Sequence, residues 1–157
     1  MYAEFEEEHG LYSHAIEIYD RMINNVPEGE RYQAFNIYIA KVSKLLGITK
    51  TRAIFDAALQ KLDEKEVMQI GRKYADIEVK MGEVERARAV YTYISQFTSP
   101  KDDREGIWQE WENFETEYGD KETFKEHLRV KRSVDAKFVM LPPDLERIEE
   151  EVKRGLS

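Results

Sequence analysis

Apolar residues recur along this chain at intervals of three or four positions, the spacing that places side chains on one face of an α-helix. One such stripe consists of Ile70, Tyr74, Ile77 and Met81. A second consists of Trp108, Trp111, Phe114 and Tyr118. Each stripe stops directly before a glycine, Gly82 or Gly119. The pattern therefore predicts helices that end in a sharp reversal of the chain.

The same pattern divides the remaining sequence into pairs of helices. We predict first helices over residues 1–9, 31–46, 64–81 and 105–118. We predict second helices over residues 11–25, 49–61, 83–96 and 121–136. Between the pairs lie polar segments with turn-forming Asn, Pro, Gly and Asp, which we interpret as loops: residues 24–29, 62–64 and 98–103.

Four glycines mark a repeat in this arrangement. Gly10, Gly47, Gly82 and Gly119 stand 37, 35 and 37 residues apart. Eight residues before them stand Tyr2, Ile39, Tyr74 and Trp111, and eight or nine after the first three stand Tyr19, Phe55 and Tyr91. This period is typical of stacked helical repeats and not of a closed catalytic domain. We expect each glycine to adopt the left-handed conformation that ends a helix.

The pattern breaks after Lys137, where Pro142 and Pro143 cannot continue a helix. We expect a repeat region over residues 1–137, with repeats at 1–25, 31–61, 64–96 and 105–136, and a C-terminal extension over residues 138–157. A short helix over 144–154 would either cap the array or be mobile. Because the repeat pattern is present from the first residues, we also expect the chain to be part of a longer array.

The predicted fold class is all-α, a right-handed α-α superhelix (solenoid) of antiparallel helix pairs. With 41% hydrophobic and 36% charged residues, the composition suits thin two-layer packing with much solvated surface. The chain has no cysteine, which excludes a disulfide framework and a thiolate metal site. No apolar run approaches the roughly 20 residues of a membrane span. The net charge of −8 argues against bulk nucleic-acid binding, although a local basic patch remains compatible with it.

Two motifs carry a resemblance to a known family. The first helix of the last repeat contains Trp108, Trp111 and Phe114-Glu115, and second helices contain Arg86-Ala87-Arg88-Ala89-Val90-Tyr91 and Thr51-Arg52-Ala53-Ile54-Phe55. This combination resembles the HAT (half-a-TPR) repeat. The ordered set of repeats over residues 1–137 is similar to the C-terminal part of the crooked-neck-like pre-mRNA splicing factors. The first and fourth repeats depart mildly, with His14-Ala15-Ile16 and Leu128 at motif positions.

The resemblance implies a non-catalytic scaffold of a NineTeen-type spliceosomal complex in the nucleus. Its implied partners are other splicing-complex proteins, including other HAT-repeat factors. The array ends could also mediate self-association. Two alternatives stay open: a HAT scaffold of another RNA-processing machine, such as mRNA 3′-end cleavage or ribosomal-RNA processing, and a direct RNA-binding module.

The sequence offers no constellation for catalysis, a cofactor or a metal. The three histidines, His9, His14 and His127, form no H-E-x-x-H pattern, and we expect structural or surface roles for them. The acidic runs at 6–8 and 149–151 are typical of solvated helix faces. Asp102 and Asp103 lack calcium-loop spacing, and we expect the segment 102–105 to start the helix that carries Trp108.

Glu78 and Glu115 each stand four residues before a glycine, while Arg52 and Arg88 stand three before an aromatic residue. We predict that Glu78 pairs with Arg88 across the third hairpin and fixes its geometry. The alternative is two separately solvated charges.

The stripe of Trp108, Trp111 and Phe114 allows two interpretations. It could be an exposed peptide-binding surface, but we favour the repeat core. Tyr74 and Tyr91 are assigned as structural repeat positions.

Charge is segregated near the C-terminal end of the array. Residues 102–120 contain eight acids and one base, and residues 121–137 contain six bases and three acids. Lys125, Arg129, Lys131 and Arg132 are therefore candidates for contact with a protein partner or RNA. A simpler explanation is that they balance the neighbouring acidic helix, and that explanation is at least as good.

Overall fold

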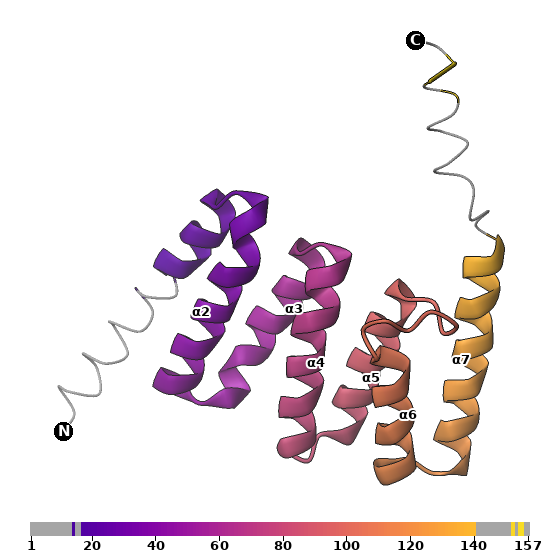
Figure 1. Cartoon of the computed structure of the whole chain (residues 1–157). Helices are drawn as coiled ribbons and strands as arrows, with labels where there is room; N and C mark the ends of the chain where they lie inside the picture. The colour runs from indigo at the N-terminus through magenta and orange to yellow at the C-terminus, as the bar shows by residue number, and fades with distance from the viewer. Residues whose placement is uncertain (1–13, 15–16, 141–151, 153, 156–157) are drawn as a thin grey trace. The chain divides into compact units, whose positions relative to one another are not determined.

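The computed structural model describes residues 14, 17–140, 152, 154 and 155. These residues are α-helical or lie in 3-10 turns and short connections (Figure 1). The chain forms two compact units, Met1–Met81 and Gly82–Ser157. The division falls at the turn inside the third predicted repeat, and the repeat limits themselves stay a prediction.

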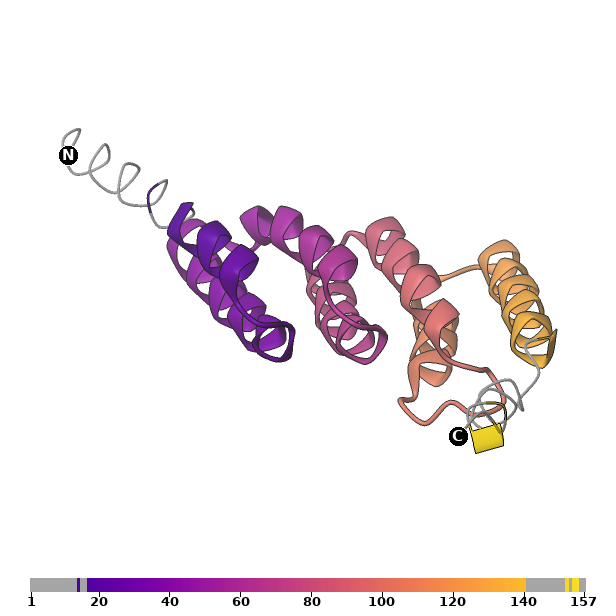
Figure 2. The same ribbon diagram turned by 90° about the horizontal axis from the view of Figure 1, so that it is seen from above.

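The first unit contains a helix over residues 17–25 followed by three longer elements and a 3-10 turn. These are α2 (Glu28–Leu46), η1 (Ile48–Thr51), α3 (Arg52–Lys61) and α4 (Glu64–Lys80). Short connections reverse the chain, so that consecutive helices of this unit lie side by side and antiparallel (Figures 1 and 2). Its core includes Phe35, Val42, Phe55, Ile70 and Tyr74.

The second unit is built the same way. It contains α5 (Val84–Ile94), η2 (Ser95–Phe97), α6 (Ile107–Tyr118) and α7 (Lys121–Met140). Its core includes Val90, Ile94, Ile107, Trp111 and Val134. The all-α class and the antiparallel pairing of helices within each unit are therefore confirmed.

Three helix starts differ from the prediction by two or three residues, each for a local reason. Helix α3 begins at Arg52 and not at 49, because residues 48–51 form the 3-10 turn η1. Helix α2 begins at Glu28 and not at 31, because Pro27 supplies the cap position and acidic Glu28 and Glu30 occupy the first turn. Helix α6 begins at Ile107 and not at 105, because Gly106 adopts a left-handed conformation with φ 73°. Asp103 still acts at this helix start, since its side chain accepts a hydrogen bond from the Gln109 N–H at 3.1 Å.

At its C-terminal end α7 continues to Met140, four residues beyond the predicted limit of 136. Phe138 and Val139 therefore belong to the helix and not to an extension. The short helix expected over 144–154 lies largely outside the described residues. Of that segment, Val152 and Arg154 have helical backbone and are exposed.

The glycines do not all serve the purpose that we predicted. Gly47 and Gly82 have φ of 91° and 78°, so the expected left-handed conformation is confirmed at these two. Gly119 has φ −90° and ψ −178°, which is extended backbone, so the prediction is wrong there. Glycine is needed at 119 because a Cβ would lie 2.5 Å from Thr123 Oγ1 and 2.7 Å from the Glu115 carbonyl oxygen. Gly10 lies outside the described residues.

Candidate interaction surface

Helices α3 and α4 meet at a junction that contains one ion pair. Arg52 Nε donates to Glu78 Oε1 at 2.8 Å, and Arg52 Nη2 donates to Oε2 at 3.1 Å. The Glu78 side chain is fully buried, while the Arg52 side chain keeps partial contact with solvent. A buried carboxylate is tolerated only with such a partner, since an unpaired charge in the interior is costly.

The junction between α5 and α6 repeats this ion pair. Arg88 Nε donates to Glu115 Oε1 at 2.9 Å, and Arg88 also contacts exposed Glu85 at 2.6 Å. The hydrogen bond to Glu115 is the main reason why the pKa of the Arg88 guanidinium is raised. Like Glu78, Glu115 is buried.

Our predicted pairing of Glu78 with Arg88 is therefore wrong. Each arginine binds the glutamate of the following first helix, and not the glutamate of the helix that precedes it. The sequence contained a signal for this arrangement, because the two pairs are separated by nearly the same distance: 26 residues from Arg52 to Glu78 and 27 from Arg88 to Glu115.

Aromatic contacts accompany the ion pairs. Phe55 and Tyr74 stack with ring centroids 4.7 Å apart, and the Tyr74 hydroxyl donates to Asp56 at 3.2 Å. The helix over 17–25 meets α2 in the same way, since Tyr19 stacks on Tyr38 at 5.1 Å and Tyr38 donates to Asp20 at 3.3 Å. The sequence reasoning missed both tyrosine–aspartate bonds, although each joins residues 18 positions apart.

The tryptophan stripe of α6 lies in the core of the second unit. Trp108, Trp111 and Phe114 are buried, whereas Tyr118 is 44% exposed. Trp108 Nε1 donates to the Thr98 carbonyl oxygen at 2.9 Å, which ties the preceding loop to the helix. The burial of these three rings agrees with the preferred interpretation of the stripe as repeat core, and Tyr74 and Tyr91 are buried as well.

His127 packs against this stripe from α7. Its ring lies 4.6 Å from Trp111 in an edge-on arrangement and is almost completely buried. Burial lowers the pKa of His127, and the positive charge of Lys131 lowers it further, while Glu112 and Glu115 act in the opposite direction. The neutral imidazole is therefore the form that fits the core. His14 is exposed, and His9 lies outside the described residues.

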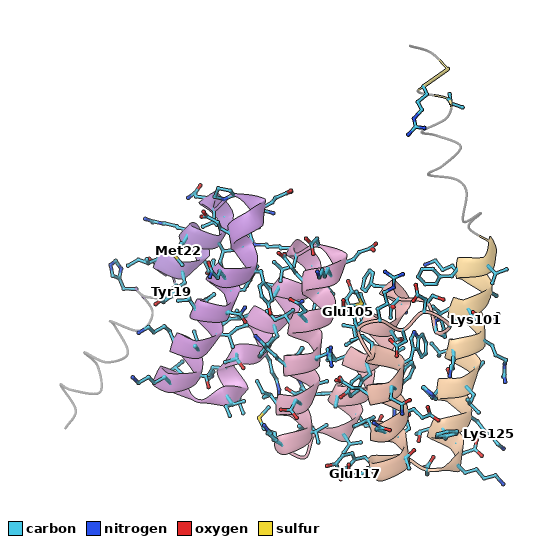
Figure 3. The ribbon with its side chains drawn as sticks, viewed as in Figure 1. Tyr19, Met22, Lys101, Glu105, Glu117 and Lys125 are labelled. Carbon is cyan, nitrogen blue, oxygen red and sulfur yellow. The ribbon has the colours of Figure 1, made fainter. Side chains whose placement is uncertain are left out.

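The predicted contact residues do not share one surface. Lys125, Arg129 and Arg132 are exposed on one side of α7, and Figure 3 shows Lys125 extending outward from that helix. Lys131 lies on a different side, is half-buried and acts on His127. Lys125 Nζ lies 3.9 Å from Glu122, and Arg129 Nε donates to Glu126 at 3.0 Å. These pairs lie within α7, so for these two residues the balance of charge is local.

Among the described residues, no three His, Asp or Glu side chains come together as a metal ion would require. In that same part of the chain, no helix combines the length and apolar character needed to cross a membrane.

Comparison with known proteins places these helix pairs among the HAT repeats. Residues 1–151 match the family model described as "Pre-mRNA-splicing factor Syf1/CRNKL1 C-terminal HAT repeat". The chain is similar to "Pre-mRNA-splicing factor syf1" of Aspergillus fumigatus, with 44% identity over 138 residues, and to the syf1 homolog of Drosophila melanogaster, with 41%. It is 39% identical to "Pre-mRNA-splicing factor SYF1" of Homo sapiens. Each alignment covers 88% of this chain and 16% of the relative, so the chain spans about a sixth of their length.

Proposed function

Since the chain belongs to the Syf1/CRNKL1 C-terminal HAT-repeat family, we propose that it is a non-catalytic scaffold for protein–protein interactions in pre-mRNA splicing. The observation that carries the proposal is the family match over residues 1–151, together with relatives that are themselves named as splicing factors. The proposal extends to the nucleus as its location, and to other splicing-complex proteins, including HAT-repeat factors, as its partners.

The geometry supports a scaffold because its two buried ion pairs join neighbouring helices to each other. Arg52 and Glu78 bind each other, as do Arg88 and Glu115, and both carboxylates are buried. Groups held in this way fix the spacing of neighbouring helices and are not available to a substrate. A preformed helical surface also loses little conformational freedom when a partner binds, which favours affinity.

Affinity purification from nuclear extract tests this function. The tagged chain is immobilised and the retained proteins are identified by mass spectrometry. We expect proteins of the spliceosome to be enriched. Enrichment of mRNA 3′-end cleavage factors or of nucleolar processing proteins would instead support a HAT scaffold of another machine, and would contradict the proposal.

The Trp111→Ala variant is the control for this experiment. Trp111 is buried in the second unit, so its loss weakens that fold without changing the surface charge. Partners that recognise the folded second unit are lost with this variant. Proteins that adhere to unfolded apolar segments are retained or increase, and are discounted.

A further inference from the structure

Equivalent residues of the second helices α3, α5 and α7 are separated by a nearly constant number of positions in the sequence. Arg88 follows Arg52 by 36 residues, and Lys125 follows Arg88 by 37. Lys125 therefore stands where an arginine binds a buried glutamate in both junctions. In α7 this position is an exposed cation, which lies 3.9 Å from Glu122 of its own helix.

Other residues that are buried on α3 or α5 also have exposed equivalents on α7. Phe55 and Tyr91 are buried against the following helix, whereas Leu128, at their position, is 37% exposed. Ser95 is buried, whereas Arg132, at its position, is exposed. Within the described part of the chain, no helix therefore covers the side of α7 that corresponds to the packing side of α3 and α5. We call this side the outer α7 surface: Lys125, Leu128, Arg129, Arg132, Ala136 and Val139.

The chemistry of the outer α7 surface indicates its ligand. Where Asp56 accepts a hydrogen bond from Tyr74, the corresponding residue of α7 is Arg129, a donor that bonds Glu126 of its own helix. Consider a helix that packs on this surface as α4 packs on α3. Its residue equivalent to Glu78 would lie against Lys125, and its residue equivalent to Tyr74 would lie against Arg129. Both positions favour a carboxylate, and they are four residues apart on the arriving helix.

We infer that the outer α7 surface binds an acidic amphipathic helix of a partner protein, with two carboxylates four residues apart that contact Lys125 and Arg129. Apolar side chains on the same face of that helix cover Leu128 and Val139. The inference deepens the proposed scaffold function and rests on it. It names the surface and the chemistry of one partner.

Features of the surface favour a helix over RNA. Leu128 and Val139, which is 63% exposed, present apolar area that phosphates would not cover. The outer α7 surface contains no aromatic ring on which a base could stack, and stacking supplies much of the affinity for single strands. The equivalent positions on α3 and α5 are both covered by a helix, α4 or α6, which also favours a helix as the ligand of α7.

A peptide based on α4 tests the inference. The probe has the sequence of residues 63–81 with Tyr74→Glu, so that its two glutamates have the required spacing, and carries a fluorescent label. Binding to the full chain is followed by fluorescence anisotropy at low salt. We expect Lys125→Glu to weaken binding by about tenfold, because an attractive contact becomes a repulsive one. A probe that also carries Glu78→Lys should recover most of that loss on the Lys125→Glu chain.

Lys137→Glu is the matched control, because Lys137 is an exposed lysine on another side of the same helix. It should change the affinity by no more than about twofold, as expected of a distant surface charge. Equal losses with Lys125→Glu and Lys137→Glu, or no measurable binding, would overturn the inference. Circular dichroism confirms that each variant is folded.

A 20-nucleotide oligouridylate is titrated in parallel. If Lys125→Glu reduces RNA affinity more than peptide affinity, the outer α7 surface is an RNA site and the inference fails. These results are separate from the test of the proposed function. Spliceosomal proteins can still be retained through other surfaces when the peptide does not bind, whereas a set without them contradicts the scaffold function itself.

Discussion

The α3–α4 and α5–α6 junctions share an ion pair but differ in their aromatic contacts. In the first, Tyr74 stacks on Phe55 and bonds Asp56. In the second, Trp111 takes the position of Tyr74 and Thr92 that of Asp56, so both partners of the tyrosine–aspartate bond have been replaced together. Thr92 instead bonds the Arg88 carbonyl oxygen of its own helix at 2.8 Å.

This difference indicates that the ion pair sets how the two helices of a junction are aligned, whereas the aromatic rings fill the space between them. The arginine–glutamate pair is directional, and a buried carboxylate requires a charged hydrogen-bonding partner, which arginine supplies in both junctions. The rings differ between the junctions, because the larger Trp111 at the position of Tyr74 contacts different neighbours. In the second unit, Tyr91 turns to Phe114 at 5.2 Å, and Trp111 packs against His127.

The largest expected effect concerns the ring that distinguishes the second unit. Trp111→Ala should lower the free energy of unfolding of that unit by about 3–5 kcal/mol, because it removes a fully buried indole. Guanidinium unfolding, followed by the fluorescence of the remaining Trp108, measures this. Glu117→Ala, at an exposed site of the same helix, should change the free energy of unfolding by no more than about 0.5 kcal/mol. Unchanged unfolding together with lost partner binding would show that the stripe is an interface.

The shared ion pair is tested by double-mutant cycles in both junctions. Alanine substitutions of Arg52 with Glu78, and of Arg88 with Glu115, should each give a coupling energy of about 1–3 kcal/mol in the free energy of unfolding. The cycle that combines Glu78 with Arg88 is the matched control, and should give a value near zero since each residue binds another partner. Coupling in the control cycle and none in the other two would restore the pairing that we first predicted.

The tyrosine–aspartate bond distinguishes the first unit. Tyr74→Phe keeps the stacked ring but removes the hydroxyl that donates to Asp56, so the free energy of unfolding should fall by about 1 kcal/mol. Chemical unfolding of the single variants and of the Tyr74→Phe, Asp56→Ala pair measures this. Losses that simply add in the double variant would mean that the hydroxyl contributes through a group other than Asp56.

The sequence was sufficient for the helices because their apolar period is strong. It was insufficient for the first residues of α2 and α6, because Pro27 and Gly106 determine these helix starts through backbone conformation and not through periodicity. It also failed at Gly119, since the repeated spacing hid two different physical reasons for glycine: left-handed backbone at Gly47, and a steric limit at Gly119. Pattern alone indicates that a residue is required, and contacts show why.

The ion pairs illustrate the same limit for the candidate site. Periodicity placed Glu78 and Arg88 at equivalent heights on neighbouring helices, but it could not decide between the preceding and the following helix as the partner. That decision depends on which side of each second helix faces the next first helix. Knowing which side of α7 is exposed also separates Lys131 from the outer α7 surface, because each turn of this helix contains both buried and exposed residues.

The smallest expected effect is a pH dependence confined to the second unit. Burial lowers the pKa of His127 below its ordinary value of 6.5, so the unfolded chain binds the proton more readily than the folded one. The stability that neutral His127 contributes is present above pH 6.5, and declines as the pH falls through 6.5 toward the lower pKa of the folded state. Lys131 acts in the same direction, whereas Glu112 and Glu115 oppose it.

Hydrogen exchange of α6 and α7 at pH 7.5 and 5.5, corrected for the intrinsic rate, measures this decline against α3 and α4. Protection should fall at the lower pH in the second unit and less in the first. His127→Gln should remove the difference, because glutamine fills a similar space without titrating in this range. His14→Gln, at an exposed site, should leave it unchanged. A decline that persists in His127→Gln would contradict the assignment of this pH dependence to His127.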